Sequence, residues 1–140
     1  MKQFHHLIQS LQIAQWCNSP LHIGNHQKHH HSDSIQKCHE LILWIIPQLD
    51  KFPRQRRFTL GDKIEQRLLD VLELLIEATY MHRGKARLLE QVNTQLTVLR
   101  HLWRLTFELK IIAQKKYIYG GQLLVELGKQ IGGWQKQASQ

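Results

Sequence analysis

The sequence predicts an all-α protein, an antiparallel four-helix bundle that follows a flexible, histidine-rich amino-terminal arm. Two observations predict this fold class. Apolar residues recur at helical spacing in four successive segments, and short connections with Pro, Gly or clustered charge separate these segments. With 140 residues and a hydrophobic fraction of 42%, the chain can build one core. We expect the arm over residues 1–33, the bundle over residues 34–136 and a frayed tail over residues 137–140.

The arm has a helical pattern only at its beginning. A short amphipathic helix is indicated by apolar residues at helical spacing, namely Phe4, Leu7, Ile8, Leu11 and Ala14. From Asn18 to Asp33 the composition becomes that of a linker, with proline, glycine and five histidines. The spacing of these histidines relative to Cys17 and to the Cys38–His39 pair is unlike that of structural zinc sites, so we expect no specific metal site.

The first bundle helix is expected to begin near Ser32 or Ser34, which are good N-cap residues, and to run to about Leu49. Pro47 lies inside this pattern, where it removes one hydrogen bond and clashes with the preceding turn. We therefore expect a kink or an early end there. Cys38 is predicted to be a small core residue rather than a nucleophile, because it falls on the buried stripe of Ile35, Cys38, Leu41, Ile42, Ile45 and Leu49.

The segment KFPRQRRFTLGDKI, Lys51 to Ile64, separates the first helix from the second. Phe52 and Pro53 are expected to end the first helix. Thr59, with Asp62 three residues later, resembles a capping box that opens the second helix. Between these signals, positive charge is concentrated in Arg54, Arg56 and Arg57.

The second helix is predicted from about Leu60 to Tyr80 and the third from about Ala86 to Leu109, with a turn at Gly84. On the second helix we expect Arg67 to pair with Asp70. Its predicted buried face comprises Ile64, Leu68, Val71, Leu72, Leu75 and Thr79. That of the third helix comprises Leu88, Leu89, Val92, Leu96, Leu99, Trp103 and Thr106.

The third helix carries a second apolar stripe, roughly 120° from the first, at 100° per residue. A helix in a lone bundle needs only one buried face. The additional stripe favours packing against another subunit, while a more central place in its own bundle remains the alternative. The residues predicted for an oligomer interface are Val98, Leu102, Leu105 and Leu109.

The fourth helix is predicted from Ala113 to Ile131. Gly120 and Gly121 cost about 1 kcal/mol each relative to alanine, so packing must offset them. Gly128 is expected to let another helix approach closely. Gly132 and Gly133 resemble a C-terminal cap, after which Trp134 would fold back onto the last turn.

The chain is strongly basic, with a net charge of +8 and a pI near 9.8. Such a balance favours polyanionic partners, although a solvated positive face is the simpler explanation. There are two cysteines, and the amino terminus has no continuous apolar region of the kind that a secretory signal contains. We therefore expect reduced thiols, a cytoplasmic location and no membrane-spanning segment.

The chain also resembles a known family. The KFPRQRRFTLGDKI segment, the LLDVLELLIEA and RHLWRLTFEL helices and the closing LGKQIGGW are similar to the accessory variability determinant (Avd) of diversity-generating retroelements, over roughly Ser34 to Lys136. The resemblance implies a four-helix bundle that assembles into a barrel-shaped homopentamer with a basic surface. It also implies binding of a reverse transcriptase and of template-repeat RNA, or an RNA/DNA hybrid, in support of mutagenic cDNA synthesis. The alternative family is that of four-helix proteins encoded within intervening sequences of 23S rRNA genes.

Phosphate binding requires long cationic side chains on a scaffold, and each neutralised phosphate releases counterions. Tyr117, Tyr119 or His101 could stack on unpaired bases, although aromatic residues at helical spacing are more often core. The candidate nucleic-acid-binding residues are Arg54, Arg56, Arg57, Lys63, Arg67, Arg83, Lys85, Arg87, Arg100, Arg104, Lys115 and Lys116.

No motif for catalysis is present: the sequence has no P-loop, nucleophile elbow or HExxH, and Asp70, Glu73 and Glu77 have no histidine at the spacing of di-metal bundles. We therefore expect neither enzymatic activity nor a cofactor. A protein-only interaction scaffold remains an alternative, which salt-sensitive RNA binding would exclude. A peripheral membrane protein is disfavoured, since the amphipathic faces are needed for the core.

Overall fold

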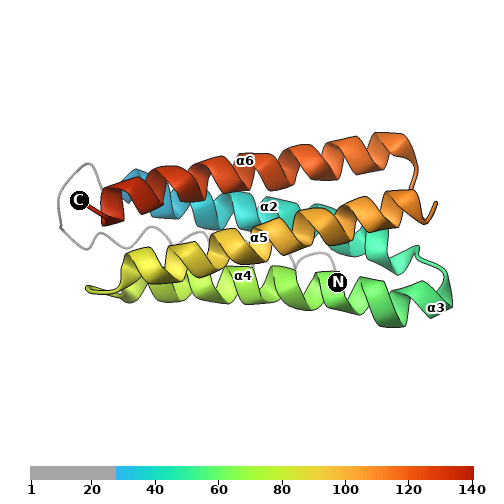
Figure 1. Cartoon of the computed structure of the whole chain (residues 1–140), viewed down its shortest axis with the longest axis horizontal. Coiled ribbons are helices and arrows are strands. Elements are labelled where there is room, and N and C mark those ends of the chain that lie inside the picture. The colour runs from blue at the N-terminus through green and yellow to red at the C-terminus, as the bar shows by residue number, and fades with distance from the viewer. Residues whose placement is uncertain (1–27) are drawn as a thin grey trace, which may run out of the picture.

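The computed structural model describes residues 28–140, which form a bundle of four long helices (Figure 1). These helices are α2 (Lys28–Asp50), α4 (Asp62–Tyr80), α5 (Lys85–Glu108) and α6 (Gln114–Ala138). A short helix, α3 (Arg54–Arg56), and a π-helical turn, η1 (Arg57–Gly61), precede α4. This part of the chain contains no strand, so the all-α prediction is confirmed for it. The helix expected near the amino terminus lies outside the described residues.

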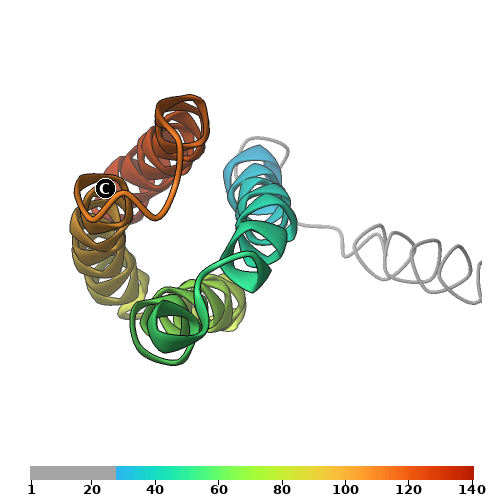
Figure 2. The same ribbon diagram turned by 90° about the vertical axis from the view of Figure 1, so that its right-hand side faces the viewer.

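The helices surround one core in the order α2, α4, α5, α6, as the view along the bundle axis shows (Figure 2). Each helix packs against the one before and the one after it, and α6 also packs against α2. Because successive helices reverse direction, the α2–α3 and α5–α6 connections lie at one end of the bundle (Figure 1). The α4–α5 turn lies at the other end, together with the carboxyl end of α6.

The core is built from the predicted stripes. Trp103 is its largest fully buried side chain, and its indole Nε1–H donates to the Tyr117 carbonyl oxygen at 3.0 Å. The Trp44 ring packs edge-on against Trp103, with 5.9 Å between ring centroids. Thr79 and Leu88 are only partly buried, whereas Ala78 belongs to the core. The other core residues include Cys38, Leu41, Ile45, Ile64, Leu68, Val71, Leu75, Leu89, Val92, Leu96, Leu99, Leu124, Leu127 and Ile131.

The expectation of an early helix end at Pro47 is wrong, because α2 continues through Pro47 to Asp50. Proline there lies in the last turn and is exposed, so the helix loses one hydrogen bond near an end that frays in any case. Leu49 is buried beyond it and keeps this turn against the core. The side-chain amide of Gln48 also donates to the Trp44 carbonyl oxygen at 3.3 Å.

The predicted capping box at Thr59 and Asp62 is also wrong. The helical segment begins six residues before the predicted start at about Leu60, since α3, η1 and α4 follow one another without a break from Arg54. Pro53 provides the start: its carbonyl oxygen accepts the amides of Arg56 and Arg57 at 2.8 and 2.9 Å. The Thr59 hydroxyl instead donates to the Gln55 carbonyl oxygen at 2.9 Å, inside the helical segment.

The turn between α4 and α5 depends on Gly84, as predicted. Gly84 has a φ of 76° and precedes the first residue of α5. This left-handed conformation is open to glycine without the steric cost that a Cβ would add. The turn therefore reverses the chain within four residues, 81–84, and fixes α4 and α5 as antiparallel neighbours.

The two adjacent glycines of α6, Gly120 and Gly121, lie in different environments. A Cβ on Gly120 would lie 2.7 Å from the Trp103 ring, whereas one on Gly121 would meet nothing within 4 Å. The lack of a side chain at Gly120 therefore lets α6 approach Trp103 of α5 closely. Packing on Trp103 offsets the low helix propensity of this glycine. Gly128 also permits a close approach, because a Cβ there would lie 2.5 Å from the Arg100 guanidinium.

The predicted cap at Gly132 and Gly133 is wrong, since α6 runs on to Ala138. Ile131 and Trp134 are both buried, and they hold the turns on either side of the two glycines against the bundle. Burial of a tryptophan outweighs the cost of about 1 kcal/mol for each glycine.

Candidate nucleic-acid interface

The end of the bundle that carries the α2–α3 and α5–α6 connections is basic. Two segments form it, residues 51–61 and residues 109–117, and neither contains Asp or Glu. We call these two segments the basic end. Its cations are Lys51, Arg54, Arg56, Arg57, Lys110, Lys115 and Lys116. Five of the predicted nucleic-acid-binding residues are therefore brought together at this end, and Lys51 and Lys110 join them.

The arginines of the basic end are exposed, and among residues 28–140 only Arg57 has a carboxylate partner. The Arg57 guanidinium lies 3.0 Å from Asp50, which ends α2. Both side chains are about half exposed (48% and 56%), so this ion pair contributes little to stability. Within residues 28–140, Arg54 and Arg56 lie within salt-bridge distance of no carboxylate. Their charge is thus available to an anionic partner.

Three further candidates lie at the opposite end, next to the α4–α5 turn. Arg83 and Arg87 are exposed there, while Lys85 is partly buried and its ammonium group lies 5.8 Å from the centroid of the Trp134 ring. A cation over an aromatic face at this distance is a favourable contact within the bundle. Because α5 has 24 residues, the two ends are about 36 Å apart at 1.5 Å per residue.

The remaining candidate nucleic-acid-binding residues lie on the sides of the bundle, between its two ends. Lys63 and Arg67 are on α4, and the predicted pair of Arg67 with Asp70 is not formed: Arg67 Nη1 donates to Gln95 Oε1 on α5, while Asp70 accepts from Gln66 at 3.1 Å. The reason is that Arg67 lies on the flank of α4 that faces α5.

On α5 the cations lie beside α6. Arg100 lies over Gly128 of α6, and Arg104 Nε is 2.6 Å from Glu108. The hydrogen bond that Arg104 donates to this carboxylate raises the pKa of the guanidinium group, which is charged in any case. Arg100 thus lies beside α6, whereas part of the Arg104 charge is already balanced by Glu108.

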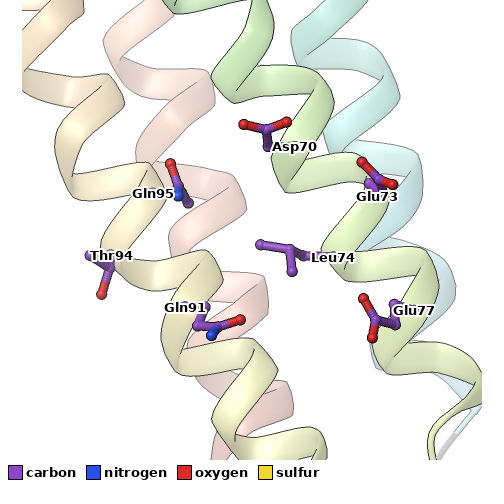
Figure 3. Close-up of a pocket in the computed structure, with 7 residues that line it drawn as sticks. All are labelled: Asp70, Glu73, Leu74, Glu77, Gln91, Thr94 and Gln95. Carbon is purple, nitrogen blue, oxygen red and sulfur yellow. The ribbon is translucent and has the colours of Figure 1, made fainter.

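The groove between α4 and α5 is acidic, in contrast to the basic end (Figure 3). It has a volume of about 480 Å³ and is lined by carboxylates from α4 and by amide and hydroxyl side chains from α5. Like charge repels phosphate, so this groove is a poor surface for nucleic acid. Its lining residues are Asp70, Glu73, Leu74, Glu77, Gln91, Thr94 and Gln95.

The two halves of the second apolar stripe of α5 differ in their exposure to solvent. Val98 and Leu102 are partly buried, and Leu102 packs against the core. Leu105 and Leu109 are 42% and 48% exposed near the end of the helix. The carboxyl-terminal half of the stripe is thus uncovered within one chain.

The aromatic residues expected to stack on bases differ in their surroundings. Tyr117 stacks on Phe107 of α5, with 4.7 Å between ring centroids. The ring centroids of Tyr119 and Trp44 are 4.8 Å apart. His101 is exposed on α5. Both tyrosine rings therefore pack against other side chains of the bundle, although Tyr119 is still partly exposed.

Neither a metal site nor a reactive thiol is found in the described part of the chain. No group of three or more His, Cys, Asp or Glu side chains in residues 28–140 could hold a metal ion. Cys38 is fully buried, and burial raises the pKa of its thiol to about 12. The prediction that Cys38 is a core residue is thus confirmed. Among the described helices, none is long and apolar enough to cross a bilayer.

Sequence reasoning missed three residues of the basic end: Lys51, Lys110 and Phe58. The two lysines could have been found from topology, because the connections of an up-and-down bundle meet at its ends. Phe58 could have been found because it falls outside every buried stripe, and it is 63% exposed.

The comparisons with known proteins agree with the resemblance seen in the sequence. The sequence model of the bAvd-like family matches residues 34–138, which include all of α4, α5 and α6 and most of α2. No curated protein and no solved structure matches the chain.

Proposed function

The chain belongs to the bAvd-like family, whose sequence model covers residues 34–138, and from this we propose that it is a non-enzymatic accessory protein of a diversity-generating retroelement. In this role it binds the template-repeat RNA and the reverse transcriptase and supports mutagenic cDNA synthesis. The observation that carries the RNA part is the basic end, with seven cations and no carboxylate in residues 51–61 and 109–117.

RNA is the partner that the charge distribution favours. Exposed arginines neutralise phosphates and release counterions as they do so. Within residues 28–140, Arg54 and Arg56 of the basic end have no carboxylate within salt-bridge distance, whereas the α4–α5 groove carries Asp70, Glu73 and Glu77. We therefore assign RNA to the basic end and exclude it from that groove.

Assembly would increase the effect of each contact. A homopentamer formed through the uncovered part of the α5 stripe, Leu105 and Leu109, would present the basic end five times. Modest contacts then combine through high effective concentration. The mechanism that we propose is positioning: the ring holds the template against the polymerase. The reverse transcriptase enters this account as a partner through family membership.

The test is the combined change Arg54→Ala, Arg56→Ala and Arg57→Ala. We expect weaker RNA binding, and a plot of log affinity against log salt that is flatter by about 2 for single-stranded RNA, because up to three phosphate contacts are lost. Fluorescence anisotropy of a labelled RNA over a salt series measures both quantities. Circular dichroism should show unchanged helicity, since the three side chains are exposed.

A control variant with the same loss of charge is available at the opposite end. Arg83→Ala, Arg87→Ala and Lys136→Ala also remove three exposed cations. We expect this variant to keep most of the affinity and the slope. RNA binding that is unchanged in a folded Arg54/Arg56/Arg57 variant, or equally weakened in the control, would show that the basic end is not the RNA surface.

A further inference from the structure

Phe58 is the exposed aromatic residue of the basic end. It lies in η1, between Arg57 and Thr59, and 63% of its surface is accessible. Single exposed apolar residues are common on protein surfaces. Phenylalanine, however, has no polar atom that water can solvate, unlike the similarly exposed Tyr80 at the other end of the bundle.

The core does not need Phe58. Phe52 and Ile112, from the two connections, are buried at this end. Gly61 lies against Phe52, since a Cβ at Gly61 would be 3.6 Å from the Phe52 ring. The end of the core is thus closed by another phenylalanine, and Phe58 is an additional aromatic side chain on the outside.

A π-helical turn carries Phe58. The Asp62 amide donates to the Arg57 carbonyl oxygen five residues earlier, which widens this turn by one residue relative to an α-helix. Such turns are rare and are often found at functional sites. Here the turn seats Gly61 in the interior while the side chains of residues 57–59 remain exposed.

Arg54 lies on the same side of the helical segment as Phe58. It precedes Phe58 by four residues, about one helical turn, whereas Arg56, two residues before Phe58, lies on a different side. Within residues 28–140, Arg54 has no carboxylate within salt-bridge distance. An apolar aromatic ring one turn from such a guanidinium group matches a nucleotide, whose base stacks and whose phosphate is anionic.

We propose that Phe58 is a stacking platform for an unpaired RNA base, with Arg54, one turn away, neutralising a phosphate next to that base. This inference rests on the RNA binding proposed above and adds a preference for single strands. Bases in a duplex are already stacked on their neighbours, and protein aromatics reach them only in loops, bulges and free strands. A protein partner would use the same ring as an apolar contact, for which a branched aliphatic side chain would largely substitute.

The experiment compares Phe58→Leu with Phe58→Trp in the full-length protein. Anisotropy is measured with a labelled single strand of mixed sequence and with a blunt RNA duplex of equal length. Loss of one base stack should weaken single-strand binding about 5- to 150-fold in Phe58→Leu, with an unchanged salt slope because no cation is lost. Phe58→Trp should restore tight binding, since its ring also stacks.

Two controls separate the possible results. Leu43→Ala removes an equally exposed apolar side chain from α2, outside the basic end, and should bind RNA as the unmodified protein does. Replacing one base of the strand by 2-aminopurine gives a direct signal, because stacking quenches its fluorescence; we expect quenching that Phe58→Leu abolishes.

Other results would overturn the proposal. If Phe58→Leu binds the single strand as tightly as the unmodified protein, the stacking role is wrong, while RNA binding by the basic end stands. If Phe58→Leu and Phe58→Trp both lower the solution mass without changing RNA affinity, the ring meets protein instead. If the unmodified protein binds neither RNA, the proposed function itself fails.

Discussion

At the scale of single residues, Gly120 and Gly121 are neighbours with opposite roles. The Trp103 ring occupies the space that a Cβ on Gly120 would need, while Gly121 has open space around its Cα. The same glycine-to-alanine change should therefore have opposite effects at adjacent positions of one helix, which isolates packing from helix propensity.

We expect Gly120→Ala to lower the free energy of unfolding by about 1–3 kcal/mol, because Trp103 must move in a close-packed core. Gly121→Ala should raise it by up to about 1 kcal/mol through helix propensity. Urea unfolding followed by circular dichroism measures both. A Gly121→Ala variant that is destabilised, or that loses its assembly, would indicate that another chain covers Gly121.

At the scale of elements, apolar periodicity predicted the helices well, whereas end signals predicted some helix boundaries, such as the turn at Gly84, and missed others. Periodicity succeeds because each helix buries one stripe, as α5 does from Leu89 to Thr106. The predicted boundaries were wrong where tertiary packing outweighed a local sequence signal for a helix end. Pro47 lies in a last turn that Leu49 anchors, Gly132 precedes the buried Trp134, and Thr59 follows a helix start that Pro53 provides.

The candidate site was predictable in composition but not in arrangement. Sequence alone identified Arg54, Arg56 and Arg57 as a cluster because they are adjacent in the chain. It could not separate them from Arg83 and Arg87, since that requires the direction of each helix. The π-helical turn that carries Phe58 has no sequence signature that periodicity detects.

The uncovered end of the α5 stripe gives a prediction about assembly. Leu105→Gln with Leu109→Gln should shift the protein toward smaller species, because both side chains are exposed in one chain and would be buried in an oligomer. Size-exclusion chromatography with light scattering measures the change. Leu69→Gln with Ile76→Gln on α4, both 42% exposed, is the matched control and should assemble normally.

An unchanged mass in the Leu105/Leu109 variant would contradict the assignment of this stripe as an oligomer interface. Equal dissociation in the control would contradict it as well, since general loss of apolar surface would then explain both results. Helicity should be the same in all variants, because none of the four side chains belongs to the core.

At the scale of the whole molecule, the charge of the bundle is distributed unevenly. The up-and-down topology gathers seven cations at one end, the α4–α5 groove is acidic, and a second, smaller basic group lies about 36 Å away at the α4–α5 turn. A net charge of +8 is thus not spread evenly. In the ring that we propose, this distribution would place the basic ends on one rim, where a template could be held.

The central claim is that this protein is an oligomeric RNA-binding accessory factor, and its solution mass with and without RNA tests that claim most directly. Light scattering at low salt should give a mass near five times 16.6 kDa, with a synthetic template RNA co-migrating. High salt should release the RNA and leave the mass of the protein unchanged, because phosphate contacts are screened while apolar interfaces are not. A monomer that does not bind RNA at low salt would contradict the account.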